Sequence, residues 1–106
     1  MRGTKVATIA AVVASVGDLL MLYVANAGRP ELGLPAAPPV LLWIGGVLGV
    51  LAIPLYAFGY RSAAARVAPR YQRHARVISA AGAAGSILGA VIHGCTAYFI
   101  HAGLAA

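Results

Sequence analysis

The sequence predicts an all-α integral membrane protein, a bundle of three transmembrane helices forming a single membrane domain over residues 1–106. Hydrophobic residues make up 61% of the 106 residues and charged residues only 9%, whereas about a quarter of the residues in a soluble domain carry a charge. The 8 basic residues lie in too apolar a chain to form the water-facing basic surface of a nucleic-acid-binding module. Lipid is therefore the expected surrounding of most side chains, and no nucleic acid is expected as a partner.

Three apolar segments, about residues 6–25, 40–60 and 77–100, are each long enough to cross a bilayer. A hydrocarbon core about 30 Å thick needs roughly 20 residues of helix, because a helix satisfies its own backbone hydrogen bonds in lipid. The first segment, followed by Ala25-Asn26-Ala27, could alternatively be a secretory signal with its cleavage site. Its length and the presence of Asp18 favour a transmembrane helix.

The two connections differ in composition, and this difference predicts the orientation of the chain. Residues 26–39 contain four prolines and two glycines, so we expect a turn-rich cap there. Residues 61–76 contain no acidic residue and five arginines, namely Arg61, Arg66, Arg70, Arg73 and Arg76. Because short basic loops stay cytoplasmic, we expect the N-terminus inside and the C-terminus outside. No sorting signal is recognisable, so a bacterial inner (plasma) membrane is the expected location.

The same arginines admit a second interpretation, in which they bind anionic lipid headgroups. Each basic side chain near the cytoplasmic leaflet gains roughly 1 kcal/mol from anionic lipids. The positive-inside rule already accounts for the five arginines without such a role. Pro69 should divide any helix in this connection, which argues against a long surface helix.

Small residues recur at helical spacing in each segment and predict close packing of the helices. Lipid provides little hydrophobic drive between helices, so packing depends on close backbone approach and a few polar contacts. The expected packing positions are Ala11, Ala14, Gly45, Gly49, Gly85 and Gly89. Three helices bury little surface between them, so we expect a homo-oligomer or a larger membrane complex.

Pro54 lies inside the second apolar segment. A proline there removes one backbone donor and leaves the carbonyl of Val50 without its usual partner. We therefore expect a kink in the second helix at Pro54.

Asp18 and His93 are the ionisable residues inside the first and third segments, and we expect both to face polypeptide and not lipid. Their depths differ by about one helical turn, so Asp18 could accept a hydrogen bond from His93 or from a nearby Ser, Thr or Tyr. The two residues form either a structural polar centre or a ligand or ion site at which the carboxylate titrates. Cys95 and His101 lie too far around or along the helix to share a metal with His93. We expect no metal and no cofactor.

Three strings, GDLLMLY (17–23), IPLYAFGY (53–60) and VIHG (91–94), resemble segments of an uncharacterised family of bacterial multi-spanning membrane proteins, defined only as a domain of unknown function. Members of that family are longer, so this chain would cover only part of the pattern. The family carries no established activity to transfer. The resemblance implies that Asp18, Pro54 and His93 belong to a recurring site.

These observations predict a non-enzymatic membrane subunit or scaffold that completes its packing by oligomerisation. The alternative is a minimal proton- or cation-coupled transporter or pore with its site at Asp18 and His93. An enzyme is not expected, because the sequence holds no nucleophile beside a base and no glycine-rich phosphate loop. A hydrated cavity that reaches the two side chains would favour transport. Dry side chains bonded to each other would favour a scaffold.

Overall fold

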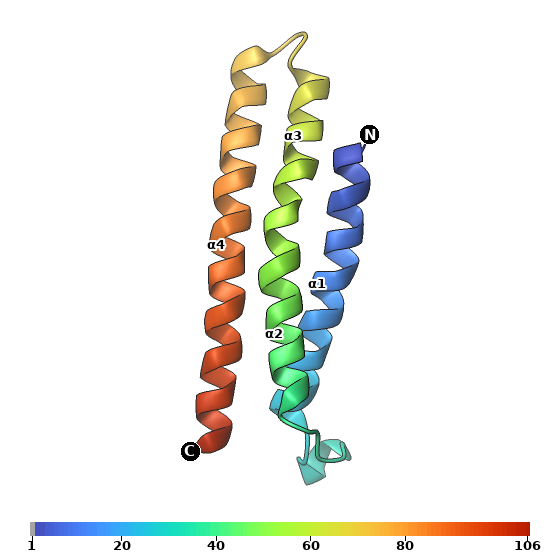
Figure 1. Cartoon of the computed structure of the whole chain (residues 1–106), viewed down its shortest axis with the longest axis vertical. Coiled ribbons are helices and arrows are strands. Elements are labelled where there is room, and N and C mark those ends of the chain that lie inside the picture. The colour runs from blue at the N-terminus through green and yellow to red at the C-terminus, as the bar shows by residue number, and fades with distance from the viewer. Residues whose placement is uncertain (1) are drawn as a thin grey trace.

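The computed structural model describes residues 2–106, and all regular structure in this range is helical (Figure 1). The elements are α1 (Arg2–Asn26), η1 (Pro30–Leu32), α2 (Val40–Ala52), η2 (Ile53–Leu55), α3 (Tyr56–Val67) and α4 (Gln72–Ala105). Three helical stretches are long and apolar enough to cross a membrane, at Arg2–Asn26, Val40–Val67 and Gln72–Ala105. The predicted all-α class with three potential spans is confirmed.

In the view of Figure 1 the chain runs down, up and down again, so its two ends lie at opposite ends of the bundle. The N-terminus lies at the end that carries the turn between α3 and α4, and the connection from α1 to α2 lies at the other end, with the C-terminus. The continuous unit α2–η2–α3 lies between α1 and α4, which pack against it from two sides and meet each other only slightly. Contact between the two outer helices is therefore confined to a few residues.

The helices extend beyond the apolar segments. The third helix begins at Gln72, before the predicted start at about residue 77, and the second continues to Val67 instead of ending at about residue 60. The connection predicted at 61–76 is consequently a helical hairpin whose turn spans residues 68–71. Alanine and arginine are strong helix formers, which explains the extension. Pro69 lies in the turn, where its missing N–H breaks no helical hydrogen bond.

We call residues 61–76 the arginine hairpin. All five of its arginines are exposed: Arg61, Arg66, Arg70, Arg73 and Arg76. They cluster at the end of the bundle that also carries the N-terminal residues Arg2 and Lys5. The opposite end holds only Arg29 and Glu31 as charged residues. The positive charge of the chain is therefore concentrated at one end of the bundle.

Glycines allow the backbones of α1 and α2 to approach closely. A Cβ atom at Gly17 would lie 2.7 Å from the carbonyl oxygen of Gly45, and one at Gly45 would lie 2.6 Å from the carbonyl oxygen of Gly17. The buried residues of α1 follow a spacing of four and three residues: Ala10, Ala14, Gly17, Met21 and Val24. This spacing places one stripe of mostly small residues against α2.

Most large apolar side chains point away from the bundle. Ile9 and Leu19 are each 65% exposed and Phe99 is 70% exposed, whereas most of the buried apolar residues are alanines. A soluble protein of this size would bury its large side chains in a core. The outward arrangement suits a lipid surrounding, in which interiors rely on small residues.

Pro54 lies in the short 3-10 turn η2, and the helix resumes directly at Tyr56. The N–H of Ile53, the residue before Pro54, still donates to the carbonyl of Gly49. The disturbance predicted at Pro54 therefore takes the form of a local tightening from α-helix to 3-10 helix, which is one way for a helix to accommodate the missing donor.

Candidate functional site

Asp18 of α1 and His93 of α4 contact each other across the bundle. The His93 Nδ1 and Asp18 Oδ1 atoms lie 3.0 Å apart. This contact joins the two outer helices, which otherwise meet only slightly. The structure thus brings together the two ionisable residues that the sequence singled out within the spans.

The second ring nitrogen of His93 is bound by α2. Nε2 lies 3.1 Å from the carbonyl oxygen of Gly45, and the side chain of His93 is only 7% exposed. A Cβ atom at Gly49 would overlap the His93 ring. The backbone of Gly45 therefore supplies the acceptor, and the missing side chain of Gly49 leaves room for the ring.

These partners determine how many protons the pair holds. A backbone carbonyl only accepts hydrogen bonds, so Nε2 carries a proton and donates it to Gly45. Nδ1 and Oδ1 then need one further proton between them, either as imidazolium with carboxylate or as neutral imidazole with carboxylic acid. Both forms have zero net charge. Loss of the shared proton leaves two acceptors facing each other and a net negative charge, which is costly away from water.

Asp18 departs from the prediction that both groups face polypeptide. Its side chain is 67% exposed although it bonds to the buried His93. The free side of the carboxylate borders a hollow of about 390 Å³ between α1, α3 and α4. We call this the Asp18 hollow, and its lining residues are Ala14, Asp18, Ile53, Tyr56, Tyr60, Gly85, Ser86 and Gly89.

A second hollow of about 450 Å³ lies between α1 and α3, nearer the N-terminus. Tyr56 and Tyr60 line both hollows, so the two hollows lie next to each other. The second hollow reaches Thr4 and Thr8, near the start of α1.

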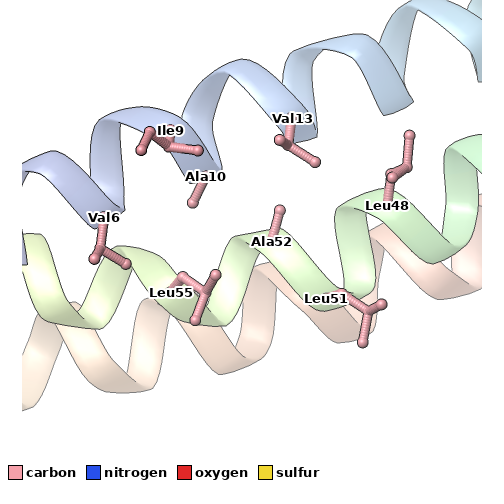
Figure 2. Close-up of a pocket in the computed structure, with 8 residues that line it drawn as sticks. All are labelled: Val6, Ile9, Ala10, Val13, Leu48, Leu51, Ala52 and Leu55. Carbon is pink, nitrogen blue, oxygen red and sulfur yellow. The ribbon is translucent and has the colours of Figure 1, made fainter.

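A third hollow, on another side of the α1–α2 pair, has no polar side chain. Figure 2 shows its lining residues, whose side chains are all hydrocarbon: Val6, Ile9, Ala10, Val13, Leu48, Leu51, Ala52 and Leu55. Its volume is about 340 Å³. Without a donor, an acceptor or a charge, this surface suits a lipid acyl chain and offers no group for chemistry.

The predicted packing positions fall into two groups. Gly45 and Gly49 lie at close approaches, Ala14 is buried, and a Cβ atom at Gly89 would lie 3.1 Å from Cγ2 of Ile53. By contrast, Ala11 is exposed in the second hollow, and a Cβ atom at Gly85 would meet nothing within 4 Å. Within this chain, Ala11 and Gly85 keep a surface open instead of packing two helices together.

Sequence reasoning missed several residues that shape the site. Gly17 lies at a close approach of α1 to α2, and its signal was the alternating four- and three-residue spacing of the buried stripe. Ser86 lies on the His93 face of α4, seven residues before it, and donates from Oγ to the carbonyl of Gly82 at 2.7 Å. Tyr56 and Tyr60 line the same hollow as Asp18, and their position there depends on how α1 packs against α3.

No group of three or more His, Cys, Asp or Glu side chains able to hold a metal ion occurs among residues 2–106. His101 instead stacks against Trp43, with ring centroids 5.0 Å apart. Cys95 is an exposed free thiol. Neither residue takes part in the Asp18–His93 pair.

Three potential spans joined by short connections, with a polar pair between the outer helices, define a small helical membrane protein. The chain belongs to the family of unknown function DUF6796, whose model matches residues 1–102. This agrees with the resemblance to an uncharacterised family drawn from the three sequence strings. Searches of curated proteins and of solved structures each returned no significant match.

Proposed function

We propose that this protein is a non-enzymatic, proton-coupled cation transporter of minimal size that works as an oligomer, with its site at Asp18 and His93. The observation that supports it is the position of the Asp18 carboxylate, which bonds to a buried imidazole on one side and borders a hollow on the other. A purely structural pair would be enclosed on both sides, because an exposed carboxylate within a bilayer is costly.

The coupling follows from charge balance. With its shared proton the pair is neutral, and without it the pair carries one negative charge. Because a net charge is unfavourable in a medium of low dielectric constant, release of the proton is favoured when a cation takes its place in the hollow. Proton and cation therefore compete for one negative charge, which is the minimal requirement for exchanging one against the other.

The test uses the whole protein in sealed vesicles with an entrapped pH-sensitive dye and an imposed pH gradient. We expect at least one of three external cations, Na⁺, K⁺ or a permanently charged organic cation, to dissipate the gradient when the protein is present. Asp18→Asn should abolish this, because the amide can donate to neutral His93 but holds no exchangeable proton. Glu31→Gln is the matched control, since Glu31 is the only other acidic residue and lies in η1. Equal fluxes for Asp18→Asn and the unaltered protein would rule out the proposed role.

A second candidate, the assembly subunit or scaffold, is favoured by a different observation. Gly85 leaves open surface in the Asp18 hollow, Ala11 is exposed in the second hollow, and most large apolar side chains point outward. A helix of another copy or of a larger complex could fill this surface. For a scaffold, native mass spectrometry from mild detergent should show a stoichiometric complex that Gly85→Leu disrupts, with no cation-dependent flux in vesicles.

The expected partners and location are part of the same proposal. The bilayer surrounds the three spans, the arginine hairpin lies on the cytoplasmic side of a bacterial inner membrane, and its side chains contact anionic headgroups. The concentration of basic residues at one end of the bundle supports this orientation.

A further inference from the structure

We propose that the Asp18 hollow binds a monovalent organic cation with apolar substituents, such as a quaternary ammonium ion, in exchange for the proton shared by Asp18 and His93. This inference rests on the proposed transport function and specifies its ligand class. Three properties of the hollow support it: one negative pole, aromatic walls and a lining that is half apolar with a single carboxylate.

The negative pole is the Asp18 carboxylate. The titratable groups that face it are His93 from α4 and Tyr56 and Tyr60 from α3, whereas α2 contributes only the uncharged Gly45 and Gly49. No lysine or arginine lines the hollow. When the shared proton leaves for water, the carboxylate turns from Nδ1 of neutral His93 towards the cation, and the site is again neutral. One proton is released for each cation bound.

The aromatic walls are the side chains of Tyr56 and Tyr60. Tyrosine rings attract cations through their negative faces, most strongly where water is excluded. The Tyr60 ring is held against α4, because a Cβ atom at Gly82 would overlap it. Tyr56 lines the same hollow as the Asp18 carboxylate. Carboxylate and rings together form a surface that suits a positively charged group with hydrocarbon substituents.

A bare metal cation fits this hollow poorly. Such ions replace their hydration shell with several oxygen ligands, and residues 2–106 contain no cluster of three acidic, His or Cys side chains. Half of the lining residues have no polar side-chain atom, namely Ala14, Ile53, Gly85 and Gly89. The volume of about 390 Å³ lies within the range of roughly 300–1,000 Å³ typical of sites for small organic ligands. The lining of the hollow therefore suits an organic cation better than Na⁺ or K⁺.

The test is calorimetric titration of the full-length protein in lipid nanodiscs with benzyltrimethylammonium, repeated in buffers of different ionisation enthalpy. We expect saturable binding, release of about one proton per cation, weaker binding at lower pH, and no competition from Na⁺ or K⁺. Asp18→Asn should abolish binding. Tyr56→Leu should weaken it about three- to tenfold through loss of the ring, while Tyr56→Phe retains it.

A filling variant tests the location of the ligand. Gly85→Leu should block binding by occupying the hollow, because a Cβ atom there meets nothing within 4 Å. Gly103→Leu is the matched control, since Gly103 is equally open but lies near the end of α4, away from the site. Equal binding by Gly85→Leu and Gly103→Leu would place the ligand elsewhere and overturn the inference.

The remaining outcomes separate the ligand class from the transport function. Proton release driven equally by Na⁺ or K⁺ would overturn the organic-cation inference and leave proton–cation exchange standing. Absence of proton release with every cation would overturn both. A third outcome is that the unaltered protein binds no cation and Gly85→Leu loses its oligomeric state. This would show that a helix of a second copy fills the hollow, and it would overturn the inference.

Discussion

His93 is held at both ring nitrogens, by the Asp18 carboxyl group and the Gly45 carbonyl. A buried imidazole in this position is restricted in both rotation and proton count, because Nε2 needs a proton directed at the Gly45 carbonyl and Nδ1 shares one with Asp18. The open side of Asp18 is then the place where the charge of the pair can respond to its surroundings. Asymmetric burial of the two partners is what distinguishes this pair from a sealed structural ion pair.

Gly49→Ala tests whether the ring needs the space that a glycine leaves. A methyl group at this position would overlap His93, so the ring must move and lose one or both acceptors. We expect a loss of about 1–3 kcal/mol in the free energy of unfolding, as is typical of overpacked interiors. Denaturation in detergent measures the loss, and the imidazole signals in NMR spectra report displacement of the ring.

Gly103→Ala is the control for that substitution, because it adds the same methyl group where nothing lies within 4 Å. Its stability should match that of the unaltered protein. If Gly49→Ala also left the stability and the imidazole signals unchanged, the ring would not need the space at Gly49.

The helices are organised around the crossing of α1 and α2 at Gly17 and Gly45. Backbone atoms cannot move aside as a flexible side chain does, so any substituent at this crossing separates the two helices. The crossing also sets the rotation of α1, and this rotation directs the residue after Gly17, Asp18, towards His93 and the hollow. Packing at one pair of glycines therefore positions the polar site.

Gly17→Ala and Gly85→Ala should differ sharply although both replace a glycine within a helix. The first places a methyl group 2.7 Å from the Gly45 carbonyl oxygen, and the second places it in open space. We expect Gly17→Ala to cost about 1–3 kcal/mol and to weaken the Asp18–His93 contact. Gly85→Ala should be neutral or slightly stabilising because alanine favours helix. Unfolding measurements on the two variants compare their free energies of unfolding. Equal changes would argue against a close approach of α1 and α2 at Gly17 and Gly45.

Along the long axis of the molecule, most charged residues lie in different regions from the apolar side chains. Basic residues gather at the end that holds the arginine hairpin and the N-terminus, while outward-facing apolar side chains cover the length of the spans. This distribution suits a chain whose packing is completed by lipid and by other polypeptide. We therefore expect a few arginines to determine the orientation of the chain in the membrane.

The predicted orientation can be tested with a reporter enzyme that is active only outside the cytoplasm. Fused at the C-terminus it should be active, and fused after Val67, in the arginine hairpin, it should be inactive. Replacing the five hairpin arginines with glutamine should produce mixed orientations, because the charge difference between the two ends then falls. Activity at the Val67 fusion of the unaltered chain would reverse the assignment.

Composition and segment length were enough to predict an all-helical chain with three potential spans. Each spanning segment must satisfy its own backbone hydrogen bonds, which is a local property of about 20 consecutive residues. The ends of the helices were less predictable, since an Ala- and Arg-rich helix continues past the edge of the hydrocarbon. Asp18 and His93 stood out in the sequence because ionisable residues are rare within spans.

The geometry around those two residues required the arrangement of the helices in space. Rotation of a helix about its axis depends on contacts between residues far apart in the chain, such as Gly17 with Gly45 and Gly49 with His93. The packing of the helices leaves Asp18 open on one side and places Tyr56 and Tyr60 beside it. Hydrophobicity along a sequence says which residues enter the bilayer, but close packing between helices decides which of them meet.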